Sequence, residues 1–428
     1  MTNINTFDWL FYIKKYEDLQ RANIDSEEKA YHHWITSGQK EGRICSHEKS
    51  VNSMNKPNLK IKYYAVSNNS GYAESGRAYI KMLRDNGVQI KFCDIFTNDQ
   101  RHDDFSYNYV IIQLLPTSYR LICNFERRLN KNVKIFGLTM WESDMIPLQW
   151  ASEINTLLDF LIVPSEWNKY VFSKHVRKPI YVVHQPISDI VVPEVKKNIM
   201  ANIDKKDYVF YTIGQWNARK RIDILITVYL NTFTKDDNVV LFVKTFLRNY
   251  SIADKKILSS HIEKLIKKFP NPARVIYNLD LLDDAEMYMI HRRGNCFVSP
   301  CASEAIGLGA CYAALMNNRV IITNYGGHLE YLKCVDLIKS EMIPAESCGY
   351  LPLNHNNCFG DICKHYPCYD PKLQKWARAD SNHLKELMVD AYKKKLEGNM
   401  ETKQYILDHF NSNKIYAEFK KIDEFSSF

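Results

Sequence analysis

The sequence predicts an α/β protein with two doubly wound, Rossmann-like domains and a small helical module in front of them. Two series of short apolar segments, rich in β-branched and aromatic residues, alternate with polar or amphipathic stretches long enough for helices. Segments this apolar are buried on both faces, as in parallel sheets that helices cover. The 428 residues are also too many for one hydrophobic core, which favours two or three domains.

The first 45 residues differ from everything that follows, and residues 1–45 are expected to be a small helical accessory module. Asp25 and Glu28 predict a capping box at the start of its second helix. Residues 46–60 are polar and predict a linker. Aromatic residues at helical spacing in the first helix are expected to form a small core rather than a binding surface: Phe7, Trp9, Tyr12 and Tyr16.

The first series of apolar segments predicts an N-terminal Rossmann-like domain over residues 61–190, on one side of a cleft. Its strands are expected at KIKYYAV, YVIIQLL, VKIFGLTM, FLIVPS and PIYVVHQP. NNSGYAESG is the turn after the first strand, where a phosphate or a sugar usually approaches such a sheet. Gly71 and Gly76 are too far apart for a GxGxxG fingerprint, so a dinucleotide is poorly supported.

The second series begins after a charged stretch and predicts a second Rossmann-like domain over residues 206–395, on the other side of the cleft. Its strands are expected at YVFYTIG, VVLFVKTF, RVIYNLD, NCFVSP and RVIITNYGG. Residues 396–428 are helical by periodicity and are expected to pack back on the N-terminal domain. His184, in VVHQP, is expected to be a hydrogen-bonded histidine at a strand end.

Charged residues and glycines follow two strands of the second series. Glu304, Gly307 and Gly309 come after NCFVSP, where glycines let the backbone approach a ligand and a helix is expected to start near Gly309. Arg219 and Lys220 come after YVFYTIG, and cations at a helix start suit a diphosphate. The structural alternatives are a helix cap for Glu304 and solvated surface charges for the two cations.

Composition and charge restrict the classes of function that are expected for this protein. The net charge of +8 is modest and is compatible with an anionic ligand, with peripheral membrane contact or with a solvated basic surface. The basic residues are dispersed and not interleaved with aromatics, so a nucleic-acid partner is not expected. Eleven scattered cysteines and an N-terminal segment interrupted by charges favour reduced thiols, no signal peptide and a cytoplasmic location.

A zinc site is the alternative interpretation of one late cluster of cysteines and histidines. The gaps between its cysteines are at the edge of the spacing that zinc sites favour. We expect no metal there. The cluster consists of Cys348, His355, Cys358, Cys363, His365 and Cys368.

Several segments, in this order, resemble the retaining GT-B glycosyltransferases, the family that includes bacterial mannosyltransferases and sucrose and glycogen synthases. They are SGYAESGRAYIKMLRDNG, TMWESDMIPLQW, DFLIVPSEWNKYVF, IGQWNARKRIDILI and SPCASEAIGLG…RVIITNYGGHLEYL. The resemblance covers most of residues 60–420. It implies transfer of a sugar from a nucleoside-diphosphate sugar to a hydroxyl of a glycan, glycolipid or protein-linked sugar, with retention and without a metal or other cofactor.

The resemblance also implies roles for individual residues. Lys220 and Arg219 would hold the donor diphosphate and stabilise the leaving group, and Glu304 would bond hydroxyls of the donor sugar. Gly71 and Tyr72 would approach the phosphates from the other domain. Backbone contacts to the sugar and phosphate would come from Gly307, Leu308 and Gly309. The nucleotide base would lie at Asn278, Leu279, Asp280 and Leu281.

Three positions depart from the family pattern. Tyr312 stands where a second glutamate usually binds the ribose, and Gln215 stands where an arginine is common; both are kept as donor-binding candidates. Trp141 and Glu142 occupy the region of a common histidine and are candidate acceptor-binding or catalytic residues, with a purely structural acid as the alternative for Glu142. Two other functions stay open: a nucleotide-sugar epimerase on the same fold, and a non-catalytic homologue that binds sugar or nucleotide.

Overall fold

The structure is a computed structural model. It describes residues 7–38, 41, 43–45, 59–68, 70–95, 97, 105–187, 198–345, 369–395 and 397–425. The chain forms two compact units, one of residues 1–59 with 424–428 and one of residues 60–423. The second unit contains both predicted Rossmann-like domains.

The first unit is a small helical module around an aromatic core. Its helices are α1 (Trp9–Lys15), α2 (Glu17–Arg21), α3 (Glu27–His33) and a π-helical turn, η2 (Trp34–Gly38). Phe7 and Tyr12 are buried in its core, with ring centroids 5.3 Å apart, and Trp9 and Tyr16 pack against that core. The predicted role of these aromatic residues is therefore confirmed.

The predicted capping box at Asp25 and Glu28 is wrong. Ser26 caps α3, and its Oγ accepts a hydrogen bond from the Lys29 amide at 3.4 Å. Asp25 instead accepts a hydrogen bond from Lys29 Nζ at 2.7 Å. Serine and aspartate are both good N-caps, so adjacent candidates leave a one-residue ambiguity that the sequence does not resolve.

The second unit begins with a parallel sheet that, within the described residues, has six strands. Its order is β2 (Gln89–Asp94), β1 (Lys60–Ala65), β3 (Tyr109–Ile112), β4 (Lys134–Leu138), β5 (Phe160–Val163) and β6 (Ile180–Val182). The strand order reverses between β1 and β3. Lys60, assigned to the linker by the sequence, is the first residue of β1.

The other parallel sheet also has six strands in the part of the chain that the structure describes. Its order is β12 (Asp336–Ile338), β11 (Arg319–Thr323), β10 (Cys296–Ser299), β7 (Tyr208–Gln215), β8 (Val239–Phe246) and β9 (Arg274–Asn278). Here the order reverses between β7 and β10. Open α/β sheets bind ligands beyond the carboxyl ends of the strands at such a switch point, and the loops with Lys220 and Glu304 follow these two strands.

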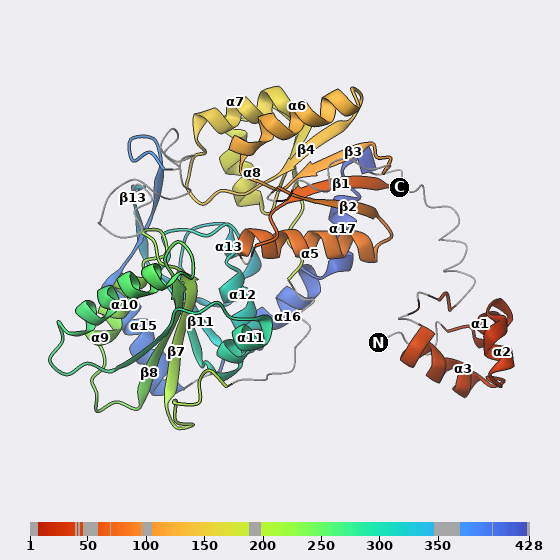
Figure 1. Cartoon of the computed structure of the whole chain (residues 1–428). Coiled ribbons are helices and arrows are strands. Elements are labelled where there is room, and N and C mark those ends of the chain that lie inside the picture. Colours follow the sequence, from red (N-terminus) through yellow and green to blue (C-terminus); the bar gives the residue numbers. More distant parts are fainter. Residues whose placement is uncertain are drawn as a thin grey trace. The chain divides into compact units, whose positions relative to one another are not determined.

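Helices connect the strands of both sheets, as Figure 1 shows. A small antiparallel pair, β13 (Ser340–Pro344) and β14 (Lys375–Ala379), precedes α15 (Ser381–Lys394). The connecting helices of the first half are α5 (Gly71–Asp85), η3 (Pro116–Ser118), α6 (Tyr119–Leu129), α7 (Leu148–Leu157) and α8 (Glu166–Ser173). Those of the second half are α9 (Ile222–Leu230), α10 (Ile252–Ile266), α11 (Asp284–Arg293), α12 (Leu308–Leu315) and α13 (His328–Tyr331).

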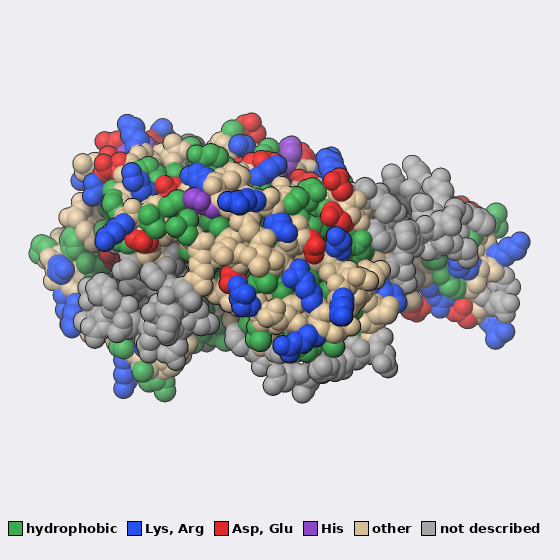
Figure 2. Space-filling model, turned by 90° about the horizontal axis from the view of Figure 1, so that it is seen from above, with side chains coloured by type: hydrophobic (Ala, Val, Ile, Leu, Met, Phe, Trp, Pro, Cys, Tyr) green, Lys and Arg blue, Asp and Glu red, His purple; other side chains and the backbone are tan. Residues whose placement is uncertain are grey.

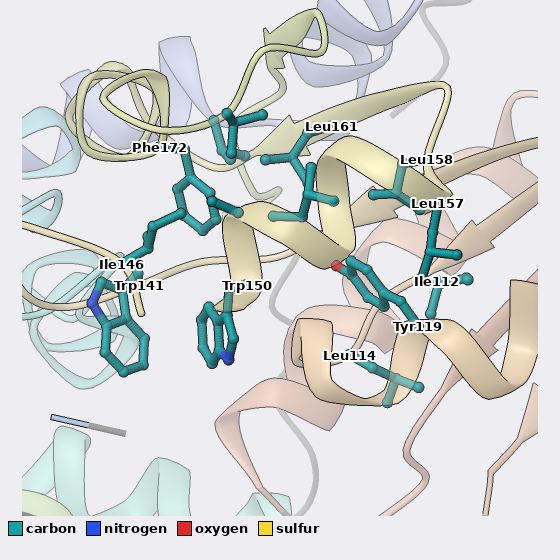
Figure 3. Packing of buried hydrophobic residues seen from close by; sticks show 14 of the residues in the cluster. Ile112, Leu114, Tyr119, Trp141, Ile146, Trp150, Leu157, Leu158, Leu161 and Phe172 are labelled. Atoms are coloured by element: carbon teal, nitrogen blue, oxygen red, sulfur yellow. The ribbon is translucent and has the colours of Figure 1, made fainter. Parts of the chain in front are cut away.

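Part of the core of the first half lies between its sheet and the helices α6, α7 and α8. Figure 3 shows Trp150 of α7 next to Trp141, with Phe172 of α8 beyond them. The two indole rings meet edge to face, with centroids 4.6 Å apart. Aromatic pairs in this arrangement stabilise a core beyond the area they bury, so the loop that carries Trp141 is held firmly against the first half.

The α-helices α16 (Met400–His409) and α17 (Ser412–Phe419) pack on both halves of this unit. α16 packs against α12, and α17 packs against α5 (Figure 1). Ile187 also donates a backbone hydrogen bond to the carbonyl of Phe410 at 2.9 Å. The C-terminal helices therefore contact both Rossmann-like halves.

The surface carries charges of both signs. On the face shown in Figure 2, basic side chains are spread over the surface and acidic side chains lie among them. No helix of the described residues is long and apolar enough to span a bilayer.

Candidate functional site

A cavity of about 1190 Å³ lies between the two Rossmann-like halves, at the carboxyl ends of their strands. It is lined from the first half by Tyr72 and Glu142 and from the second half by Lys220, Glu304 and Tyr312. Pockets for drug-sized ligands usually measure about 300–1,000 Å³. This cavity is therefore large enough for an extended ligand together with a second molecule.

Three charged side chains from the second half meet on the cavity wall. Arg219 and Lys220 lie in the loop between β7 and α9, and Glu304 lies in the loop between β10 and α12. Arg219 Nη1 donates to Glu304 Oε2 at 2.9 Å and to the carbonyl of Ser303 at 2.6 Å. Lys220 Nζ donates to Glu304 Oε1. The sequence-predicted trio is thus brought together in one cluster.

Glu142 joins this cluster from the first half. Arg219 Nη2 lies 3.3 Å from Glu142 Oε1, and the side chains are 15% and 22% exposed. The phenol of Tyr369 donates to Glu142 Oε2 at 3.3 Å. Arg219 therefore bridges carboxylates from the two halves, and the cluster of two cations and two carboxylates has no net charge.

Electrostatics keep Glu304 and Arg219 ionised although both are largely buried. Burial raises the pKa of Glu304, but Lys220 and Arg219 outweigh burial and hold that pKa well below the usual range. Burial lowers the pKa of Arg219, and the carboxylates of Glu142 and Glu304 more than compensate, so the guanidinium stays charged. An anionic ligand could take the place of Glu304 as the partner of Lys220 and Arg219, so that the two cations stay paired when the ligand binds.

The loop after Glu304 needs glycine at one position. Gly307 has φ of 73°, and a Cβ there would lie 2.9 Å from the Cβ of His328. α12 begins directly after it at Leu308, one residue from the predicted start at Gly309, and no side chain caps this helix. Gly307, Leu308 and Gly309 all line the cavity, so backbone groups at a helix start face the site.

Gly71 and Tyr72 line the cavity from the start of α5. A Cβ on Gly71 would meet nothing within 4 Å, so this residue borders open space. The Tyr72 hydroxyl lies 2.8 Å from Thr139 Oγ1, and burial raises its pKa. Both residues therefore border the cavity from the first half.

Tyr312 reaches across the cavity to the first half. Its hydroxyl donates to Glu74 Oε1 at 2.5 Å, and Glu74 lies in the first turn of α5. Burial raises the pKa of both groups; the Glu74 carboxylate raises that of Tyr312 further, and the Tyr312 hydrogen bond partly offsets the rise at Glu74. A carboxylate is therefore present beside position 312, although it comes from the other half of the protein.

The predicted base-binding segment is only partly at the cavity. Leu281 lines it, but Asn278, Leu279 and Asp280 are not among its lining residues. Leu279 packs against the second-half core, and Asp280 pairs with Lys255 at 2.6 Å. Leu279 is thus engaged by the core and Asp280 by an ion pair within the protein.

Gln215 and Trp141 line the cavity but also have structural contacts. Gln215 Nε2 donates to the carbonyl of Leu247 at 2.8 Å. Trp141 is 3% exposed, and its Nε1 donates to Ser143 Oγ at 2.7 Å and to the carbonyl of Met145 at 2.8 Å. Trp141 therefore positions the loop of Glu142 and presents little surface to a ligand.

Among the cavity residues that were not predicted from the sequence are Glu74 and Lys244. Lys244 is the charged residue in the otherwise largely apolar strand VVLFVKTF, and this charge could have marked it as a candidate. Glu74 follows Gly71 by three residues in a turn that had already been singled out. In both cases, a charged residue lies near the end of a strand where a ligand was expected to bind.

A second cross-domain cluster lies around His184. Its Nε2 is 3.3 Å from Glu330 Oε2 and its Nδ1 is 3.0 Å from Glu418 Oε1 of α17. Glu330 also accepts hydrogen bonds from the amides of Glu166 and Trp167 at 2.9 and 2.6 Å, at the start of α8. His184 is hydrogen-bonded, as expected, and this cluster joins the two halves.

The cysteine and histidine cluster from Cys348 to Cys368 lies outside the described residues. Within the described residues, no group of three or more histidine, cysteine, aspartate or glutamate side chains is placed to hold a metal ion. The absence of a metal requirement stays a prediction.

Comparisons with known proteins identify the fold of the chain. No family model and no curated protein sequence matches the chain. Among solved structures, sucrose-phosphate synthase from Thermosynechococcus elongatus is similar with a TM-score of 0.60 at 12% identity, over 86% of this chain and 98% of that chain.

Two further structures have the same arrangement. HepE from Anabaena, solved with UDP and glucose, gives a TM-score of 0.55 at 9% identity, over 86% of this chain and 100% of that chain. An α,α-trehalose 6-phosphate synthase from Burkholderia multivorans gives 0.56 at 7% identity, over 87% and 100%. With the two six-stranded parallel sheets and the cavity between them, these likenesses show that the chain has the GT-B fold.

Proposed function

We propose that the protein is a glycosyltransferase that moves a sugar from a nucleoside-diphosphate sugar to an acceptor hydroxyl, with retention of configuration. One observation carries the proposal: Arg219 and Lys220 converge on Glu304 at the wall of a large interdomain cavity. The solved structures with the same fold include a complex with UDP and glucose. The acceptor is a carbohydrate or a glycoconjugate.

The charged cluster supplies the electrostatics that this reaction needs. Departure of a nucleoside diphosphate from an oxocarbenium-like centre places new negative charge on the leaving phosphate. Lys220 and Arg219 stabilise that charge, as fixed cations in a water-poor site do best. Their interaction with the phosphates releases Glu304 to accept hydrogen bonds from hydroxyls of the donor sugar. No metal ion is required for this step.

Glu142 and Tyr369 border the same cluster on the first-half side, where the acceptor enters. The leaving phosphate itself takes the proton of the acceptor hydroxyl, so the mechanism needs no separate general base. The acceptor oxygen then forms its bond on the face that the phosphate leaves, which retains the configuration. In this mechanism Glu142 holds Arg219 in place rather than taking the proton.

Two alanine variants test the proposal. Lys220→Ala and Glu304→Ala are each expected to lower turnover at least tenfold while the protein stays folded, because each removes a group that contacts the reacting donor. Lys235→Ala is the matched control, since Lys235 is an exposed residue of the same domain. Near wild-type turnover in both active-site variants would refute the assignment.

The donor is found first by a thermal-shift screen with uridine, guanosine, adenosine and thymidine diphosphates and their sugars. A bound ligand raises the melting temperature by mass action. Transfer is then measured with the stabilising sugar donor and a panel of carbohydrate acceptors, with the anomeric configuration of the product read by NMR. Nucleotide binding without transfer to any acceptor would instead identify a non-catalytic binding protein.

A further inference from the structure

Lys244 is a buried cation in the cavity that the charged cluster does not use. It lies on β8, is 4% exposed and lines the cavity. Its Nζ has no hydrogen-bond partner within the described residues, and it lies 5.1 Å from the centre of the Tyr250 ring. Burial lowers the pKa of Lys244 to about 8, although the charge of Asp280 opposes this effect. A buried ammonium without a hydrogen-bond acceptor is costly, which points to a partner supplied by a ligand.

Aromatic and aliphatic side chains line the cavity near the end of β8 and after its neighbouring strand β9. Phe246 is two residues further along the same strand and therefore faces the same side of the sheet. Its ring stacks on that of Tyr250, with centroids 4.9 Å apart and an angle of 29°. Leu281 and Met287 line the cavity from the β9–α11 loop and from α11. Such walls suit a planar heterocycle.

This part of the cavity is a poor phosphate site. α11 begins beside it, but Asp283 and Glu286 already form a capping box at the start of that helix, and Asp284 lines the cavity in its first turn. These carboxylates repel an anion. A neutral acceptor, such as a carbonyl oxygen, fits a single buried ammonium better than a phosphate does.

The strand β7, which pairs with β8, connects Lys244 with the charged cluster. Its register partner on β7 is Ile213. The following residue, Gly214, lies against the side chain of Lys220: a Cβ there would be 3.5 Å from Lys220 Cδ. A ligand with its diphosphate at Lys220 can therefore extend along the ends of these two strands toward Lys244.

We propose that Lys244 recognises the base of the donor nucleotide by donating a hydrogen bond from Nζ to an exocyclic carbonyl oxygen of the base. The protein then selects nucleotides whose base carries such a carbonyl, as uracil, thymine and guanine do, over adenine, which has none. This inference rests on the proposed function, because it places the diphosphate at Lys220. It replaces the segment Asn278–Asp280 as the source of base recognition.

Calorimetric titration of the full chain with UDP, GDP, TDP and ADP tests the selection. At least one carbonyl-bearing nucleotide is expected to bind tenfold or more tightly than ADP. Lys244→Met, which keeps the length of the side chain and removes the ammonium, is expected to abolish that preference. Pyrophosphate, a probe without a base, is expected to bind Lys244→Met as tightly as wild type, whereas Lys220→Met weakens binding of every one of these ligands.

Two further measurements separate recognition from folding. Lys244→Met is expected to melt at the same or a higher temperature than wild type, because it removes a buried ammonium that lacks an acceptor in the protein. Lys244→Gln, which retains an N–H donor, is expected to keep part of the preference and serves if the methionine variant does not fold.

The outcomes distinguish this inference from the proposed function. Tightest binding of ADP, an unchanged preference in Lys244→Met, or loss of pyrophosphate binding in that variant would overturn the role of Lys244 alone, since nucleotides would still bind. No binding of any nucleoside diphosphate to the wild type would overturn the proposed function and this inference with it.

Discussion

His184 should make the stability of the protein depend on pH in the alkaline range. Burial opposes protonation of its ring, but the hydrogen bonds to Glu330 and Glu418 outweigh burial and raise its pKa from 6.5 to about 9. A difference of this size corresponds to about 3 kcal/mol of folding free energy. Its side chain is 17% exposed, so solvent screens little of this interaction.

The sign follows from the direction of the shift. The folded protein binds the His184 proton more tightly than the unfolded chain does, so the stabilisation is complete below about pH 6.5 and is lost as pH rises through about 9. His184→Gln keeps a hydrogen-bond donor but carries no charge. The free energy of unfolding of wild type is therefore expected to fall by about 3 kcal/mol more than that of the variant between pH 6 and 9.5.

Urea unfolding at several pH values, followed by tryptophan fluorescence, measures this difference. Comparison with the variant is essential because Lys244, whose pKa burial lowers to about 8, gives the opposite slope in both proteins. His409→Gln is the control, since His409 is an exposed histidine of the nearby helix α16. Parallel stability curves for wild type and His184→Gln would refute the reasoning.

Three other predictions follow from the cavity. Glu304→Gln should lower turnover, yet it should bind nucleoside diphosphate at least tenfold more tightly by calorimetry. The substitution removes a repulsion of about 3 kcal/mol for each phosphate charge about 6 Å away, at an effective dielectric constant of about 20. Weaker binding would contradict this prediction. Gly307→Ala should lower the free energy of unfolding in urea by about 1–3 kcal/mol, because Gly307 has φ of 73° and His328 lies close to it. Gly71→Ala should leave the free energy of unfolding unchanged, and equal effects of the two substitutions would show that the turn at Gly307 is not strained. In a double-mutant cycle, Tyr312→Phe and Glu74→Gln should be coupled by about 1–2 kcal/mol in unfolding free energy, since their hydrogen bond is partly buried, and additive effects would exclude that bond.

Much of the fold follows from local sequence patterns. Strands such as β7 and β8 are dominated by apolar residues that only a sheet covered on both faces can bury, so their positions were predictable. The cluster of Arg219, Lys220 and Glu304 was predictable for a related reason: all three residues directly follow strands whose carboxyl ends meet at one edge of a sheet.

Contacts between distant segments were not predictable from patterns. Tyr312 and Glu74 are 238 residues apart, and only the packing of the two halves brings them together. Asp280 was expected at the ligand, but the side chain of Lys255, from the preceding helix, holds it elsewhere. A lysine in a strand often extends its end to solvent, so the burial of Lys244 also required the tertiary structure.

The position of α17 has a consequence for biosynthesis. Glu418 of this helix bonds the ring of His184, and the helix packs on α5, although the entire second sheet separates them along the chain. A ribosome therefore delivers this piece of the first half only after the strands from β7 to β12 have emerged. Until then the nascent first half lacks one of its covering helices, and its maturation is tied to completion of the half that follows.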